Sequence, residues 1–143
     1  MSTRTQRPSA SGYSGTPLAR KLGVKPGCVM VTIDAPPGFR ERVQAEQPEV
    51  RWADDIGPAI DIVQVFATRQ QALRPWLARC RSELVADAML WVSWPKKASK
   101  VATDITEDRV RDLALPLGFV DIKVCAVDDI WSGLKLVVRK SLR

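Results

Sequence analysis

The order of strand-like and helix-like segments constrains this chain more than any other feature of its sequence. Strand-like runs at residues 28–33, 50–52, 61–67 and 89–94 alternate with helix-like segments at 39–47, 68–85 and 106–115. The last two strand-like runs, 120–127 and 134–139, are separated by only six residues, too few for a helical crossover, so they form an antiparallel pair. This order predicts an α/β, Rossmann-like three-layer sandwich, whose mostly parallel sheet ends in an antiparallel hairpin.

Local signals predict several helix boundaries. Thr16 is suited to cap a short helix that Gly23 would end. Pro75 lies within the segment 68–85, where it should either kink the helix or mark its true first turn. Thr106 is predicted to be the N-cap of the helix that follows it.

The length of 143 residues, 45% of them hydrophobic, suits one domain with its own core. Residues 1–12 are polar and predict a disordered basic tail, which leaves a single α/β domain at 13–143. No apolar stretch suits a signal peptide or a membrane helix. The three cysteines, Cys28, Cys80 and Cys125, are widely spaced, which predicts a reducing compartment, and the apolar runs around Cys28 and Cys125 predict that these two are buried free thiols. We therefore expect a cytoplasmic protein with no membrane contact.

The chain contains no histidine. Histidine is the commonest general base and the commonest metal ligand, so its absence rules out Ser-His-Asp and Cys-His catalysis and argues against a zinc site. The sequence consequently favours a binding role over catalysis. No catalytic residue, metal or cofactor is assigned from it.

The stretch Leu-Gly-Val-Lys-Pro-Gly at 22–27, followed by the apolar run, resembles the entry to class I S-adenosylmethionine-dependent methyltransferases. The resemblance spans about residues 16–139 and implies a class I methyltransferase-like fold. Members of that family follow the first strand with a glycine-rich loop that lets the backbone approach the cofactor. Here the loop 34–38 reads Asp-Ala-Pro-Pro-Gly, and Pro36 and Pro37 have no N–H and a locked φ. Such a loop does not cradle the cofactor in the usual way, and it also argues against a dinucleotide fingerprint or a P-loop.

A second resemblance covers nearly the whole chain. The segments that carry it are residues 11–18, 90–97, 102–104, 124–128 and 131–135. They look like the domain-of-unknown-function 3052 family of bacteria, found mainly in actinobacteria, whose specific signature is Trp-Val-Ser-Trp-Pro-Lys, here at 91–96. The resemblance implies a small cytosolic protein and no particular activity.

Open α/β sheets bind ligands beyond the carboxyl ends of their strands, so polar residues that follow the predicted strands are candidates. The candidate ligand-binding residues are Asp34, Ser93, Trp94, Lys96, Lys97, Asp128, Trp131 and Ser132. The most suggestive cluster is 93–97. Lys96 and Lys97 could clamp an anion or phosphate with Trp94 as a stacking plate, or the lysines could be solvated and the tryptophan part of the core.

The other candidates also have two interpretations. Asp34 could bind a ribose hydroxyl or cap the next helix. Trp131 falls in the predicted loop 128–133, where it would either fold back over the sheet or form the wall of a pocket.

The net charge of +6 is concentrated at the ends of the chain. Residues 1–25 carry five basic and no acidic side chains, and residues 139–143 carry three more basic ones. The first group makes nucleic-acid binding possible, and the candidate residues are Arg4, Arg7, Arg20 and Lys21. No helix-turn-helix, RRM or KH signature accompanies them.

Three hypotheses follow from the sequence. The first is a non-catalytic binding or regulatory domain on a degenerate methyltransferase-like fold, acting through a partner protein. The second is an enzyme or binding protein that takes an anionic small molecule at the rim formed by residues 93–97. The third is association with nucleic acid or the ribosome through the basic termini.

Overall fold

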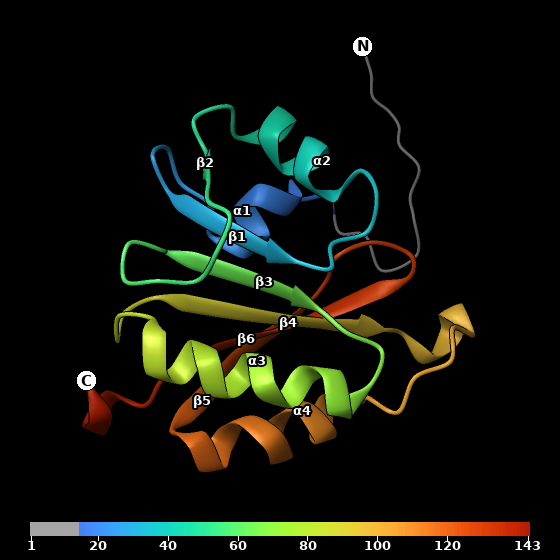
Figure 1. The fold of residues 1–143 in the computed structure, drawn as a ribbon. Helices are drawn as coiled ribbons and strands as arrows, with labels where there is room; N and C mark the ends of the chain where they lie inside the picture. The colour runs from blue at the N-terminus through green and yellow to red at the C-terminus, as the bar shows by residue number, and fades with distance from the viewer. Residues whose placement is uncertain (1–14) are drawn as a thin grey trace.

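The computed structural model describes residues 15–143 and forms a six-stranded sheet between two layers of helices (Figure 1). The strands are β1 (Val29–Ile33), β2 (Arg51–Trp52), β3 (Ile62–Phe66), β4 (Met89–Pro95), β5 (Phe119–Ala126) and β6 (Trp131–Val138). The α-helices are α1 (Leu18–Leu22), α2 (Phe39–Glu46), α3 (Gln70–Glu83) and α4 (Glu107–Ala114). Short 3₁₀ turns are η1 (Lys97–Ser99), η2 (Leu115–Leu117) and η3 (Lys140–Leu142). The predicted three-layer α/β class is confirmed.

The strand order is β2-β1-β3-β4-β6-β5. The first four strands in this order are parallel, and β6 runs antiparallel to both of its neighbours, β4 and β5. The predicted closing hairpin is therefore confirmed. The chain leaves β1 for β2 on one side and then returns across β1 to β3, so the strand order reverses between β1 and β3. This reversal is the topological switch point, beside which α/β sheets place their ligand crevice.

Each face of the sheet packs against its own pair of helices, as Figure 1 shows. On the upper face in that view, Leu18 and Leu22 of α1 and Val43 of α2 join Trp91 of the sheet in one apolar cluster. On the other face, α3 and α4 cover a second cluster built on the alternate residues of β3 and β4. The central strands β3 and β4 are thus buried from both sides, which their apolar runs predicted.

Three helix starts test the local signals. Pro17, not Thr16, is the N-cap of α1, because Pro17 is extended (ψ 141°) and the first helical residue is Leu18. Gly23 ends that helix in the left-handed conformation, as expected. Helix α3 extends on both sides of Pro75, so Pro75 does not mark its first turn. The Thr106 hydroxyl accepts a hydrogen bond from the N–H of Arg109 at 3.2 Å, which confirms the predicted cap.

The closing hairpin is tighter than the sequence indicates. Its connection is residues 127–130, and Trp131 and Ser132 lie on β6 and not in a loop. The cause is the carboxylate of Asp128, whose Oδ1 accepts hydrogen bonds from the N–H groups of Ile130 and Trp131, both at 2.8 Å. This Asx-type turn brings Trp131 into register with Pro95, so β6 begins earlier and β4 ends later than predicted.

All three cysteines are free, but only Cys80 is buried, which corrects the expectation for the other two. Cys28 and Cys125 are half-buried because each lies near an end of its strand region. Burial raises the pKa of the Cys80 thiol to about 12.

The predicted tail at 1–12, with Arg4 and Arg7, lies outside the described residues. Within residues 15–143, none of the helices has the length and apolar character that a membrane span requires.

Candidate functional site

The crevice at the switch point is bounded by the loop that follows β1. Asp34 opens this loop in the left-handed conformation (φ 55°), and Gly38 closes it with φ 89°. Helix α2 starts at Phe39 with Gly38 as its N-cap and without a side-chain cap. The expectation that Asp34 caps α2 is therefore wrong, because the two intervening prolines place Asp34 four residues before the cap. Asp34 is exposed at the start of this loop.

Three aromatic rings pack together where α2 begins and β3 ends, next to the switch point. Phe39, the first residue of α2, meets Phe66, the last residue of β3, edge-to-face with ring centroids 4.9 Å apart. Phe66 meets Trp131 in the same way at 5.1 Å. Phe39 and Phe66 are buried, and Trp131 is half-buried. Of the two interpretations of Trp131, the structure supports the one in which it folds back over the sheet.

Two basic side chains from α1 and α2 hydrogen-bond to the backbone of the β5–β6 hairpin next to this cluster. Arg42 of α2 donates a hydrogen bond to the carbonyl oxygen of Val127 at 3.2 Å. Lys21 of α1 donates from Nζ to the carbonyl oxygen of Ala126 at 3.1 Å. Lys21, which the sequence made a candidate for nucleic-acid binding, thus makes a hydrogen bond within the fold. Arg20 beside it is exposed.

Strand β2 is too short to extend the crevice. It pairs only with Val29 and Met30, at the amino end of β1. In Rossmann-type sites an acidic side chain near the end of the second strand binds the ribose hydroxyls. Here the acidic residues after β2 are Asp54 and Asp55, and Asp55 is bound by Arg79 of α3 at 2.9 Å. The acidic group that could hold a ribose therefore lies away from the carboxyl edge of the sheet.

Ser93 does not lie at the rim. It is completely buried on β4, and its hydroxyl accepts a hydrogen bond from Nε2 of Gln64 on β3 at 2.5 Å. The prediction placed it at the rim because β4 was expected to end one residue earlier, at Trp94. The extension of β4 by the hairpin moves Ser93 into the interior, so its hydroxyl cannot meet a ligand at the edge.

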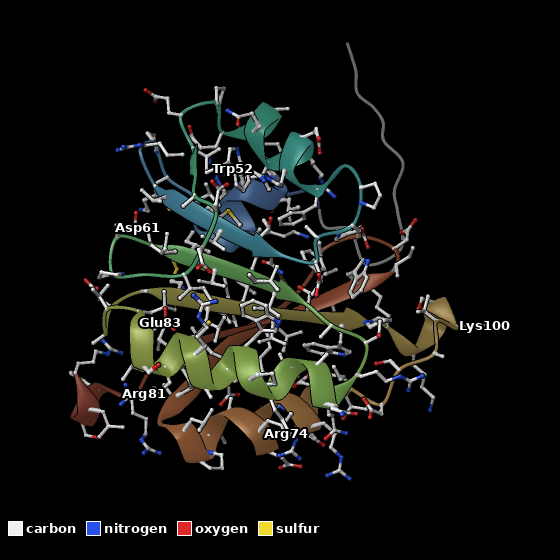
Figure 2. All side chains as sticks on the ribbon, viewed as in Figure 1. Trp52, Asp61, Arg74, Arg81, Glu83 and Lys100 are labelled. Atoms are coloured by element: carbon white, nitrogen blue, oxygen red, sulfur yellow. The ribbon has the colours of Figure 1, made fainter. Side chains whose placement is uncertain are left out.

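A hollow of about 520 Å³ lies beyond the carboxyl end of β4, between η1 and the start of α4. We call it the Trp94 hollow; its lining includes Trp94, Pro95, Lys97, Lys100, Ile105 and Glu107. Trp94 is 6% exposed and packs in the core below α3 and α4, so only part of its ring faces the hollow. Figure 2 places Lys100 at this end of the sheet, far from Asp61 and Glu83 at the opposite end.

The charge in the Trp94 hollow is positive. Lys97 and Lys100 are exposed, and within residues 15–143 neither ammonium group has a hydrogen-bond or ion-pair partner. The carboxylate of Glu107 is already bound by Arg111. Lys100 adopts the left-handed conformation (φ 62°), which is uncommon for a residue other than glycine. The hollow thus combines an apolar wall with two cations.

The structure brings only part of the predicted rim together. Trp94 and Lys97 line the Trp94 hollow, and Lys96 lies outside its lining, with its N–H bonded to the carbonyl oxygen of Ile130 at 2.7 Å. Asp128 is engaged in the hairpin turn, and Ser132 pairs with Trp94 in the strand ladder. Sequence reasoning missed Lys100, although the spacing Lys-Lys-Ala-Ser-Lys carried the signal. Within the described part of the chain, no group of three or more metal-binding side chains comes together.

Comparison with known proteins finds solved structures of similar fold. The mitomycin 7-O-methyltransferase MmcR shares 10% identity, with 85% of this chain and 53% of its own covered and a TM-score of 0.63. RosA from Streptomyces davawensis, an N,N-8-amino-8-demethyl-D-riboflavin dimethyltransferase, shares 12% identity over 86% of this chain and 51% of its own, with a TM-score of 0.63. A TehB-like S-adenosylmethionine-dependent methyltransferase from Corynebacterium glutamicum shares 12% identity over 90% of each chain, with a TM-score of 0.52.

The fold is class I methyltransferase-like. The chain spans about half the length of the first two enzymes. No model of a known protein family and no curated protein sequence matches it. At these identities the likeness extends to the fold alone, so the function has to be inferred from this chain's own residues.

Proposed function

We propose that this protein is a non-catalytic binding domain that uses a methyltransferase-like fold without binding S-adenosylmethionine. The observation that carries the proposal is the loop after β1. A cofactor crevice needs backbone N–H groups at this loop and a close approach of the backbone to the cofactor. Pro36 and Pro37 have no N–H group, and their rings are bulky.

Two further features of the crevice support the proposal. Phe39, Phe66 and Trp131 pack edge-to-face beside the switch point, where a ligand would have to lie. The shortness of β2 removes the acidic side chain that would hold a ribose. The loop after β1, the aromatic cluster and the length of β2 therefore all argue against binding of S-adenosylmethionine.

Thermal denaturation of the full chain with S-adenosylmethionine and with S-adenosylhomocysteine tests the proposal. A ligand present at about 100 times its dissociation constant stabilises a fold by ~2.7 kcal/mol, a shift of a few degrees for a domain of this size. We expect no shift at millimolar cofactor, with an active methyltransferase as the positive control. A shift that grows with cofactor concentration would overturn the proposal.

The Trp94 hollow favours a second function, the binding of an anionic small molecule. Its volume of about 520 Å³ lies within the range of ligand pockets, about 300–1,000 Å³. Trp94 and Ile105 supply an apolar wall, and Lys97 supplies a cation with no competing partner among the described residues. This pattern suits a flat apolar ring that carries a carboxylate or a phosphate.

A screen of aromatic carboxylates and nucleoside monophosphates by ligand-observed NMR tests this second function. We expect binding that is lost in the variant Lys97→Gln and retained in Lys25→Gln, a matched change of an exposed lysine outside the hollow. Equal loss in both variants would indicate a general charge effect and contradict the assignment to the Trp94 hollow.

A further inference from the structure

The β5–β6 hairpin has one covered face and one open face. On β6, Leu134, Leu136 and Val138 are buried against the α3–α4 layer, whereas Lys135 and Val137, which point the other way, are half-buried. The open face lies on the α1 side, because Lys135 pairs with Trp91, whose indole donates to the carbonyl oxygen of Leu22.

Two lysines lie opposite each other on this open face. Lys123 of β5 and Lys135 of β6 are direct cross-strand partners, which places their Cβ atoms about 4.5–5.5 Å apart. Like charges in this position destabilise a sheet. Burial and the neighbouring Lys123 together lower the pKa of Lys135. The pair therefore opposes folding, and folding alone gives no reason for it.

A third lysine borders the same face. Lys21, held at the carbonyl oxygen of Ala126, lies within electrostatic range of Cys125, as Lys123 does. Burial raises the pKa of Cys125, and these two lysines oppose the increase. We call the three side chains Lys21, Lys123 and Lys135 the lysine face.

Lys123 and Lys135 have no acidic counterpart among the described residues. The acidic residue on β5, Asp121, pairs across from Leu136 and so points to the α4 side, where Arg111 binds it at 2.8 Å. Neither Lys123 nor Lys135 has a hydrogen-bond or ion-pair partner within residues 15–143. The charges of Lys123 and Lys135 are consequently available to a binding partner.

We propose that the lysine face binds the phosphate backbone of a single-stranded nucleic acid. Open sheet faces are a recurrent platform for single strands, and basic side chains beside them bind the phosphate backbone. Each of the three cations is a lysine, which binds phosphate as a point charge. This surface is separate from the Trp94 hollow and does not depend on the function proposed for it.

Fluorescence anisotropy of a labelled single-stranded oligonucleotide, titrated with the full chain at several salt concentrations, tests this proposal. Each neutralised phosphate contributes about −0.7 to the slope of log K against log[salt] for single strands. We expect the variant Lys123→Gln/Lys135→Gln to reduce the magnitude of the slope by about 1.4 and to weaken binding at low salt. The control variant Arg69→Gln/Arg74→Gln removes the same charge from exposed side chains at the start of α3, on the other side of the sheet, and should leave the slope unchanged.

Three results would overturn the proposal. They are no binding by the unaltered chain, an equal loss in both double variants, and equally tight binding of a polyglutamate peptide that the same two substitutions abolish. The last result would indicate an acidic protein as the partner. Failure to fold is not expected for Lys123→Gln/Lys135→Gln, because the change removes a repulsive pair, and a raised melting temperature would verify this directly.

Discussion

Gln64 and Ser93 form a polar pair inside an otherwise apolar layer. Nε2 of Gln64 donates to the Ser93 hydroxyl at 2.5 Å, and both side chains are completely buried. The other amide atom, Oε1 of Gln64, has no hydrogen-bond partner among the described residues. A buried acceptor without a hydrogen bond lowers stability, so the Gln64 amide lowers the stability of the fold at its oxygen and is satisfied only at its nitrogen.

Ser93→Ala should destabilise the fold by about 1–3 kcal/mol, because it leaves both ends of the Gln64 amide without a partner. The double variant Gln64→Met/Ser93→Ala removes the polar group as well and should recover most of that loss. Urea denaturation measures both free energies of unfolding. A double variant that is less stable than Ser93→Ala alone would contradict this explanation.

Trp131→Ala should lower the free energy of unfolding by roughly 2 kcal/mol, less than the ~3–5 kcal/mol of a fully buried tryptophan because this ring is half-buried. The loss comes from its edge-to-face contact with Phe66 and from the cover it gives the crevice. Trp131→Phe keeps an aromatic ring over Phe66 and should be close to the unaltered chain in the same denaturation experiment. Equal losses in the two variants would show that the contact is unimportant.

Asp104 caps a helix that starts 34 residues earlier in the chain. Its Oδ1 accepts the N–H of Gln70, the first residue of α3, at 2.8 Å. Asp104→Ala should therefore cost about 1 kcal/mol, as the loss of other N-caps does, whereas Asp104→Asn keeps an acceptor oxygen and should cost less. Chemical denaturation followed by far-UV circular dichroism distinguishes them. An Asn variant as unstable as the Ala variant would exclude the capping role.

The ion pair of Arg111 and Asp121 predicts a pH dependence. The hydrogen bond from Arg111 lowers the pKa of Asp121 in the folded chain. The pair therefore adds stability above the unfolded pKa of about 3.9, and this stability is lost as the pH falls through the lower folded value. Between about pH 6 and about pH 3, the free energy of unfolding should fall more steeply for the unaltered chain than for Asp121→Asn. Parallel curves would contradict the prediction.

Much of the architecture follows from local sequence. Alternating strand and helix segments with a short final connection determine a parallel sheet and a closing hairpin, because period and loop length act within a few residues. The loop 34–38 could also be interpreted from the sequence, because Pro36 and Pro37 lack an N–H group in any structure.

Tertiary structure decided the rest of the candidate site. The end of β4 depended on a turn that Asp128 forms in a distant hairpin, and that turn moved Ser93 into the core beside Gln64. The Trp94 hollow likewise needs α4 to dock beside η1. A two-residue strand period assigns each side chain to a face, but only the packing of segments far apart in sequence decides whether that face meets another side chain, a hollow or solvent.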